Sequence, residues 1–235
     1  MKKIFAGSRR KVAAVMAIAL VASLSQVTTS GASGADTPKR GGKITVGIFD
    51  SFPGFCMADN LANSSLMAGR TIYETWVEQR ADGRMVPYVL KSVDKSADNK
   101  TWLLTVRDGI KFHDGSPVDG TALFVNLQAL RGALYLNGLI GRVPKSPSAG
   151  TSAGFQANIS DVIQTGAMSV TVKLYKADAN YLETLYASGR NFVRSVGQIT
   201  GNTCSTKPVG TGPFKYVSHK LTELVVAKND NYWRK

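Results

Sequence analysis

Residues 101–131 contain the pattern that most constrains the fold of this chain. Trp102, Leu104 and Val106 share one side of an alternating stretch whose other positions are mostly polar, a period of two that is typical of a half-buried strand. Two Asp-Gly dipeptides follow and predict turns around a second short apolar stretch, Ile110 to Phe112. The stretch therefore begins as strands connected by tight turns.

The second half of this stretch predicts a helix. Asp119 can accept hydrogen bonds from the free N–H groups of a helix that begins at Gly120. Leu123, Leu127 and Leu130 then recur at i, i+4 and i+7, which places them on one helical face.

The segments around this unit are also patterned. Lys43–Phe49 alternates in the manner of a strand and is expected to be the first one. A helix is expected to start near Asn63, because apolar residues continue at helical spacing as far as Val77. Near the other end, alternation around Phe214 predicts a hairpin with its turn near His219.

Two segments of the chain resemble motifs of a known family. LTVRDGIKFHDGSPVDGTALFVN resembles the signature of the family 5 extracytoplasmic solute-binding proteins, the peptide- and nickel-binding receptors of ABC importers. PVGTGPF, followed by a hairpin and N-x-x-Y-W, resembles the return of the same family to its first domain. Relatives usually carry Ala-x-Asp-Val at the helix start, where this chain has GTAL at 120–123.

The resemblance implies a fold and a division into domains. The fold would be α/β, type II periplasmic-binding-protein-like with mixed sheets, and truncated before the C-terminal lobe. Residues 42–63 and 189–235 would form a discontinuous first lobe, and residues 64–188 an inserted second lobe. The resemblance covers about residues 42–235, which correspond to the N-terminal half of the family.

The resemblance also implies a function. The chain would be the extracytoplasmic receptor of an ABC importer, which captures an oligopeptide-like or metal-chelate ligand by lobe closure and presents it to a permease in the membrane. The alternative is a secreted interaction or structural protein without transport activity, left after loss of the C-terminal lobe.

Candidate ligand-binding residues follow from the resemblance alone. In relatives the loop after the first strand and the start of the next helix face the ligand, and an arginine-bearing segment does so in the nickel-binding relative. These regions correspond here to Phe52, Asn60, Ser64, Arg190 and Arg194. An arginine fork suits a ligand carboxylate, whereas the alternative for each arginine is a structural salt bridge.

The two cysteines, Cys56 and Cys204, are expected to form a disulfide. They lie 148 positions apart, no Cys-x-x-Cys is present, and two histidines are too few for a typical structural zinc site. In an exported protein such a pair is most often oxidised, although two buried free thiols are the alternative.

Enzymatic chemistry is not expected. His113 beside Asp114 is the best isolated candidate for catalysis, but no nucleophile motif accompanies it or His219. The GTG at 210–212 lacks the Gly-Lys-Ser/Thr ending of a phosphate loop and is predicted to be a structural turn. We therefore expect no cofactor and no metal site.

The N-terminus and the charge indicate an exported protein that does not bind nucleic acid. Residues 1–35 have five basic residues and no acid, then an apolar run and small residues, as in a secretory signal peptide. No lipid-anchor cysteine follows the apolar run. The rest of the chain has 24 basic and 16 acidic residues, a net charge of +8, scattered singly rather than clustered. A periplasmic, cell-envelope or extracellular location is expected.

The signal peptide gives the first testable prediction. Cleavage should leave an exported protein whose N-terminus lies near Ala35, because small residues end the apolar region there. N-terminal sequencing of the envelope or extracellular fraction measures this. A cytoplasmic protein that keeps Met1 would contradict it.

Overall fold

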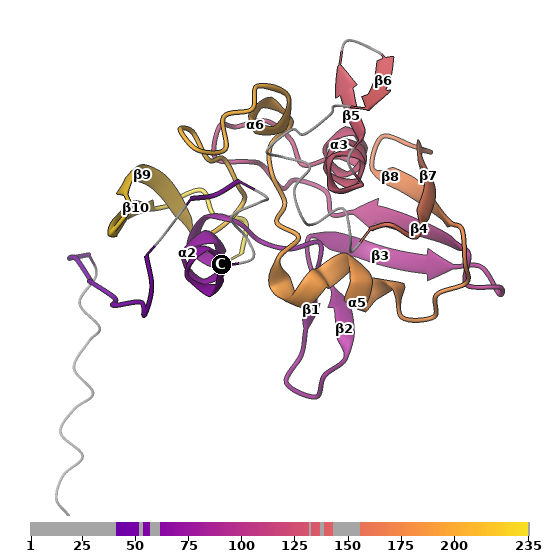
Figure 1. The fold of residues 1–235 in the computed structure, drawn as a ribbon, viewed down its shortest axis with the longest axis horizontal. Coiled ribbons are helices and arrows are strands. Elements are labelled where there is room, and N and C mark those ends of the chain that lie inside the picture. Colours follow the sequence, from indigo (N-terminus) through magenta and orange to yellow (C-terminus); the bar gives the residue numbers. More distant parts are fainter. Residues whose placement is uncertain are drawn as a thin grey trace, which may run out of the picture. The chain divides into compact units, whose positions relative to one another are not determined.

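A computed structural model describes residues 41–51, 54–56, 62–131, 133–136, 139–142 and 156–234 of the 235-residue chain. Residues 47–235 make up one compact unit, and residues up to 46 are assigned to another. Groups of consecutive strands are separated by helices along the larger unit (Figure 1). The description below concerns that unit unless residues 41–46 are named.

A four-stranded antiparallel sheet forms the centre of the larger unit. Its spatial order is β3 (Leu90–Lys95), β4 (Thr101–Val106), β8 (Ser169–Leu174) and β7 (Ile159–Gln164). The predicted alternation in β4 is confirmed, since Trp102, Leu104 and Val106 are all buried. Val172 pairs with Trp102 and Val170 with Leu104, so the apolar faces of the two central strands coincide.

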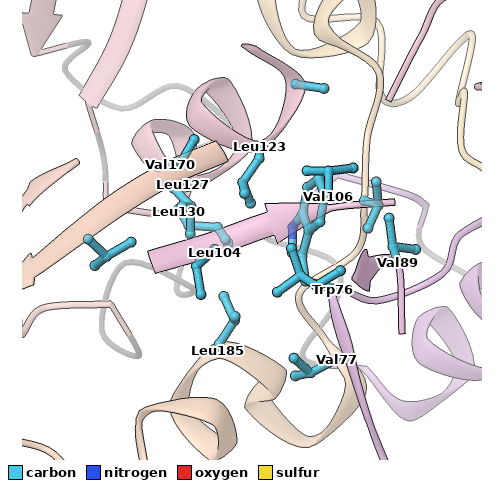
Figure 2. Packing of buried hydrophobic residues seen from close by; sticks show 14 of the residues in the cluster. Trp76, Val77, Val89, Leu104, Val106, Leu123, Leu127, Leu130, Val170 and Leu185 are labelled. Atoms are coloured by element: carbon cyan, nitrogen blue, oxygen red, sulfur yellow. The ribbon is translucent and has the colours of Figure 1, made fainter. Parts of the chain in front are cut away.

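The predicted helix is present as α3 (Gly120–Leu130), and it covers the apolar face of this sheet. The Asp119 carboxylate accepts a hydrogen bond from the Ala122 N–H at 2.8 Å and so caps the helix start. Leu123, Leu127 and Leu130 are fully buried, and Figure 2 shows them beside Leu104 of β4. Burial of each such side chain stabilises the fold by about 1.5–3 kcal/mol.

The remaining elements surround the sheet and the turn regions. In chain order they are α2 (Asn63–Ile72), β1 (Val77–Gln79), β2 (Met85–Pro87), β5 (Ala133–Leu136), β6 (Leu139–Arg142), α5 (Tyr181–Tyr186), a 3-10 helix η3 (Ala187–Gly189), α6 (Val196–Thr200), β9 (Phe214–Lys220) and β10 (Glu223–Lys228). Strands β1 and β2, β5 and β6, and β9 and β10 form three antiparallel pairs. The β9–β10 hairpin packs against α2 through a second apolar cluster (Figure 1).

The predicted first strand at Lys43–Phe49 is wrong. These residues adopt no regular structure. Ile44 is 88% exposed, and Val46 and Phe49 are also largely exposed. A strand needs a hydrogen-bonded neighbour, and none of the described residues pairs with this segment. Alternation indicates which face a strand would bury but does not supply its partner.

The helix predicted from Asn63 is confirmed, but it ends at Ile72 rather than near Val77. Tyr73 has extended backbone angles, and Thr75 makes a bridge to Phe192. The Glu74 carbonyl accepts a hydrogen bond from the Val193 N–H at 2.8 Å. Tertiary pairing with residues 192–193 therefore replaces helical hydrogen bonds in a stretch whose spacing alone favours a helix.

One predicted strand and one predicted turn differ in detail from the structure. The stretch from Ile110 to Phe112 forms an isolated bridge between Lys111 and Pro117 rather than a strand, although both of its apolar side chains are buried as expected. His219 lies inside β9, and the hairpin turns two residues later.

The predicted structural turn at residues 210–212 is confirmed by its packing against the end of α2. The Gly212 N–H donates to the Ile72 carbonyl at 2.8 Å. A Cβ at Gly210 would lie 2.3 Å from the same carbonyl oxygen, and a Cβ at Gly212 would lie 2.6 Å from it. Side chains at either position would push the turn off the helix end.

We therefore expect Gly210→Ala to destabilise the protein by about 1–3 kcal/mol, the usual cost of overpacking against rigid backbone. Gly197→Ala in α6 is the matched control, because its Cβ would meet no atom within 4 Å, and it should change stability by less than about 1 kcal/mol. Urea unfolding measures both variants. Equal stability of the two would show that the turn can move away from Ile72 at little cost.

Candidate functional site

Ser64, the first predicted ligand residue within the structure, lies at the start of α2. Its side chain is buried, and its hydroxyl donates to the Ser51 carbonyl oxygen at 2.6 Å. The loop that follows the predicted first strand is thereby held against the helix start. A role of Ser64 toward a ligand stays a prediction.

Phe52 and Asn60 lie outside the described residues, but their loop is anchored between them at Phe55. The Phe55 ring is fully buried and meets the rings of Tyr73, Tyr216 and His219 edge to face, with centroids 5.9–6.1 Å apart. Such edge-to-face pairs contribute about 0.5–1.5 kcal/mol beyond their buried area. The loop is therefore fixed to both α2 and β9.

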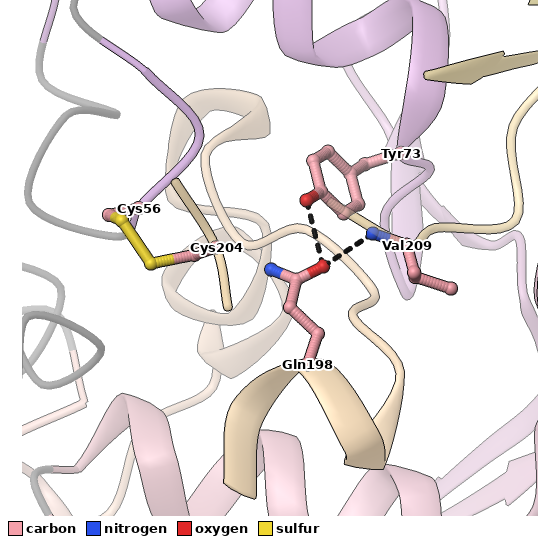
Figure 3. The surroundings of a disulfide bond; sticks show 5 residues. All are labelled: Cys56, Tyr73, Gln198, Cys204 and Val209. Atoms are coloured by element: carbon pink, nitrogen blue, oxygen red, sulfur yellow. Dashed lines mark hydrogen bonds between the residues drawn. A yellow bond between two sulfur atoms is a disulfide. The ribbon is translucent and has the colours of Figure 1, made fainter. Parts of the chain in front are cut away.

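The predicted disulfide between Cys56 and Cys204 is present beside this cluster (Figure 3). The two Cα atoms are 5.0 Å apart, within the range that a disulfide spans without backbone movement. Both cysteines are buried. The bond connects the loop around Phe55 to the segment that follows α6.

Gln198 of α6 makes a second connection in the same region. Its side-chain oxygen accepts hydrogen bonds from the Tyr73 hydroxyl at 2.9 Å and from the Val209 N–H at 2.6 Å (Figure 3). Burial raises the pKa of Tyr73 far above its usual value, against the opposing effects of Arg194 and of the Gln198 bond. Tyr73 therefore remains a protonated donor at any physiological pH.

Arg190 lies at the same end of α2 as Ser64. Its Nη2 donates to the side-chain oxygen of Asn63, the first residue of the helix, at 3.2 Å. The structure therefore brings a guanidinium group and a helix start together, and both favour an anionic group.

Arg194 lies near the opposite end of α2 and is only 2% exposed. Its guanidinium carbon is 5.5 Å from the centre of the Tyr73 ring and 5.3 Å from that of Phe192. Its backbone is held by Asn126, whose side chain accepts from the Arg194 N–H and donates to the Arg194 carbonyl. A helix of ten residues is about 15 Å long, so Arg190 and Arg194 do not form one joint fork.

Glu74 is a central residue that the sequence analysis did not single out. Its carboxylate is buried and accepts hydrogen bonds from the hydroxyls of Tyr88 and Tyr232, at 2.8 and 2.6 Å, and from the Trp233 indole N–H at 2.6 Å. Burial and the bond to Glu74 raise the pKa of Tyr232 far above its usual value. The N-x-x-Y-W motif was a usable signal, because a Tyr hydroxyl and a Trp indole N–H that are removed from water each need an acceptor.

The two histidines have structural contacts. Both ring nitrogens of His113 face backbone groups of the 210–212 turn, and His219 Nδ1 lies 3.2 Å from the Tyr216 hydroxyl. Among the residues that the structure describes, no three His, Cys, Asp or Glu side chains come together as metal ligands. Within the same residues, no helix has both the length and the apolar character needed to cross a bilayer.

Two surface depressions lie away from the predicted ligand residues. One is lined by Asp114, Asp119 and the start of α6, and the other by Phe124, Asp161 and their neighbours on α3 and β7. Neither includes Ser64, Arg190 or Arg194. The predicted ligand residues that the structure describes lie around α2, and neither depression includes them.

Comparisons with known proteins agree with this architecture. Residues 84–235 match the family described as bacterial extracellular solute-binding proteins, family 5, middle part. The chain is 28% identical to the nickel-binding periplasmic protein of Escherichia coli K12 over 176 residues, which are 72% of this chain and 31% of that protein. It is 25% identical to the oligopeptide-binding protein OppA of Bacillus subtilis 168 over 226 residues, 88% of this chain and 39% of that protein.

A solved structure shares the fold. The PBP AgaA of A. tumefaciens R10, in complex with agropinic acid, superimposes with a TM-score of 0.64 at 23% identity, covering 78% of this chain and 35% of that one. The predicted α/β fold of the periplasmic-binding-protein type is thus confirmed. The chain spans between about a third and two fifths of the length of these relatives.

The disulfide provides a prediction for this site. Replacing both Cys56 and Cys204 by Ala should destabilise the protein by about 3–5 kcal/mol, because the bond closes a loop of 148 residues in the unfolded chain. Thermal unfolding without reductant measures the effect. The unchanged chain in excess dithiothreitol is the control and should match the variant once both thiols are free; a variant as stable as the oxidised chain would contradict the prediction.

Proposed function

This chain belongs to the bacterial extracellular solute-binding proteins of family 5, and from that membership we propose that it captures an oligopeptide-like or metal-chelate ligand outside the cytoplasm for an ABC importer. The match over residues 84–235 carries the proposal. Relatives whose names specify nickel, oligopeptides and glutathione support this range of ligand classes. Export by the signal segment at residues 1–35 belongs to the same proposal.

The proposed ligand wall consists of Phe52, Asn60, Ser64, Arg190 and Arg194. Arg190 supports an anionic ligand group, because its guanidinium lies beside the uncapped start of α2, where the first turn has no acidic residue. Arg194 is only 2% exposed and packs beside the stacked rings of Tyr73 and Phe192, so its guanidinium would be a rigid group rather than a mobile one.

Two lobes are proposed to form this part of the receptor, residues 42–63 with 189–235 and residues 64–188. Polar contacts cross the boundary, among them the part-buried bond of Tyr232 to Glu74 and the buried bond of Asn126 to Arg194. A later lobe is proposed to complete the cleft, since the relatives are more than twice as long as this chain. Lobe closure would then remove most of the ligand surface from water.

Binding by the chain of 235 residues should be weak. One part of the receptor covers a ligand from one side only, so polar contacts to the ligand stay largely hydrated and contribute only about 1 kcal/mol or less each. We expect a tripeptide or a nickel–histidine chelate to bind no tighter than about millimolar, or roughly 4 kcal/mol. Isothermal titration calorimetry measures this, and saturable micromolar binding would show that this wall is sufficient alone.

In a longer form that carries the C-terminal lobe, binding should become much tighter. Arg190→Ala should then weaken a carboxylate-bearing ligand about tenfold or more, because a hydrogen bond to a charged group contributes about 1.5–3 kcal/mol. Arg84→Ala is the control, since Arg84 is largely exposed and pairs with Asp82 far from this wall in sequence. Equal affinity of the two variants would remove Arg190 from the site.

A further inference from the structure

His113 connects two turns that come from distant parts of the sequence. The backbone N–H of His113 donates to the Gly210 carbonyl at 2.9 Å. Its ring Nε2 lies 3.0 Å from the Gly212 carbonyl oxygen. The Gly210 N–H points to ring Nδ1 at 3.4 Å. The imidazole therefore bridges the backbone of the 210–212 turn.

These partners determine the protonation state of the ring. A carbonyl oxygen only accepts, so Nε2 must carry a hydrogen, and an N–H group only donates, so Nδ1 must be unprotonated. The neutral Nε2–H tautomer satisfies both contacts. A second proton on Nδ1 would place two donors face to face and break the bond to Gly210.

Burial and charge also favour the neutral ring. Burial is the main cause that lowers the pKa of His113, and Lys215 of β9 acts in the same direction. The Gly212 carbonyl and the adjacent Asp114 carboxylate oppose this but do not reverse it. A histidine with a lowered pKa in the folded protein contributes stability that is present above its unfolded pKa of about 6.5 and is lost as the pH falls below it.

The bridge is part of a larger junction. The Gly212 carbonyl also accepts from the Asn229 side chain at 3.1 Å. The Gly212 N–H donates to the Ile72 carbonyl at the end of α2. Asn229 follows β10, so the 210–212 turn links His113 to both α2 and the β9–β10 hairpin. Loss of the His113 contacts would free one side of this junction.

We propose that His113 is a pH-sensitive latch that holds the 210–212 turn to the 112–116 turn at neutral pH and releases it in acid. The 210–212 turn belongs to the proposed first lobe and the 112–116 turn to the proposed inserted lobe. Any consequence for lobe movement therefore rests on the proposed function. The latch itself depends only on the contacts of His113.

Hydrogen exchange at Gly210 in the 235-residue chain without ligand tests the latch, because this N–H donates directly to His113. NMR or mass spectrometry should show its protection, corrected for intrinsic exchange, falling about fivefold or more between pH 7.5 and pH 5, the effect of losing one part-buried hydrogen bond. His113→Gln supplies one donor and one acceptor that do not titrate and should abolish most of this fall. His219→Gln, which changes the other of the two histidines, should keep it.

Three results would overturn the latch. They are protection at Gly210 that is independent of pH, a fall that disappears in His219→Gln instead, and a pKa of His113 above 6.5 by NMR titration of the unchanged chain. The titration decides the matter even when His113→Gln does not fold. Since no ligand is used, failure here leaves the proposed binding function untouched.

Discussion

The close approach of the 210–212 turn to the end of α2 is the constraint on which the larger unit most depends. Two positions in that turn can hold no side chain, because a Cβ at Gly210 or Gly212 would overlap the Ile72 carbonyl. The same turn binds His113 and Asn229 through its backbone. The helix end, the signature turn and the hairpin are therefore aligned by one segment of backbone.

A buried carboxylate makes a second such junction. An isolated charge inside a protein is costly unless hydrogen bonds compensate it, and Glu74 has three donors in Tyr88, Tyr232 and Trp233. Two of them come from the segment after β10, so Glu74 fixes that segment to the chain just after α2. Residues that resemble family motifs thus have a structural reason to be present, independent of any ligand.

The residues of the proposed ligand wall are not themselves part of these two junctions. The disulfide and the Phe55 cluster anchor the loop, and Asn126 holds the backbone at Arg194. Arg190 and Arg194 lie at opposite ends of α2, so a ligand that contacts both would have to extend along the helix.

The sequence by itself determined the local elements whose signals are strong and short in range. The alternation of β4, the Asp119 cap and the leucine face of α3 were predicted correctly, because each depends on neighbours in the sequence. Gly120 is explained only by the structure, where a Cβ would lie 2.7 Å from the Gly166 carbonyl oxygen. Only the tertiary structure decided that α2 stops at Ile72, that residues 43–49 form no strand, and that Glu74 is a hub. Each of these depends on partners far away in the chain, for which periodicity contains no information.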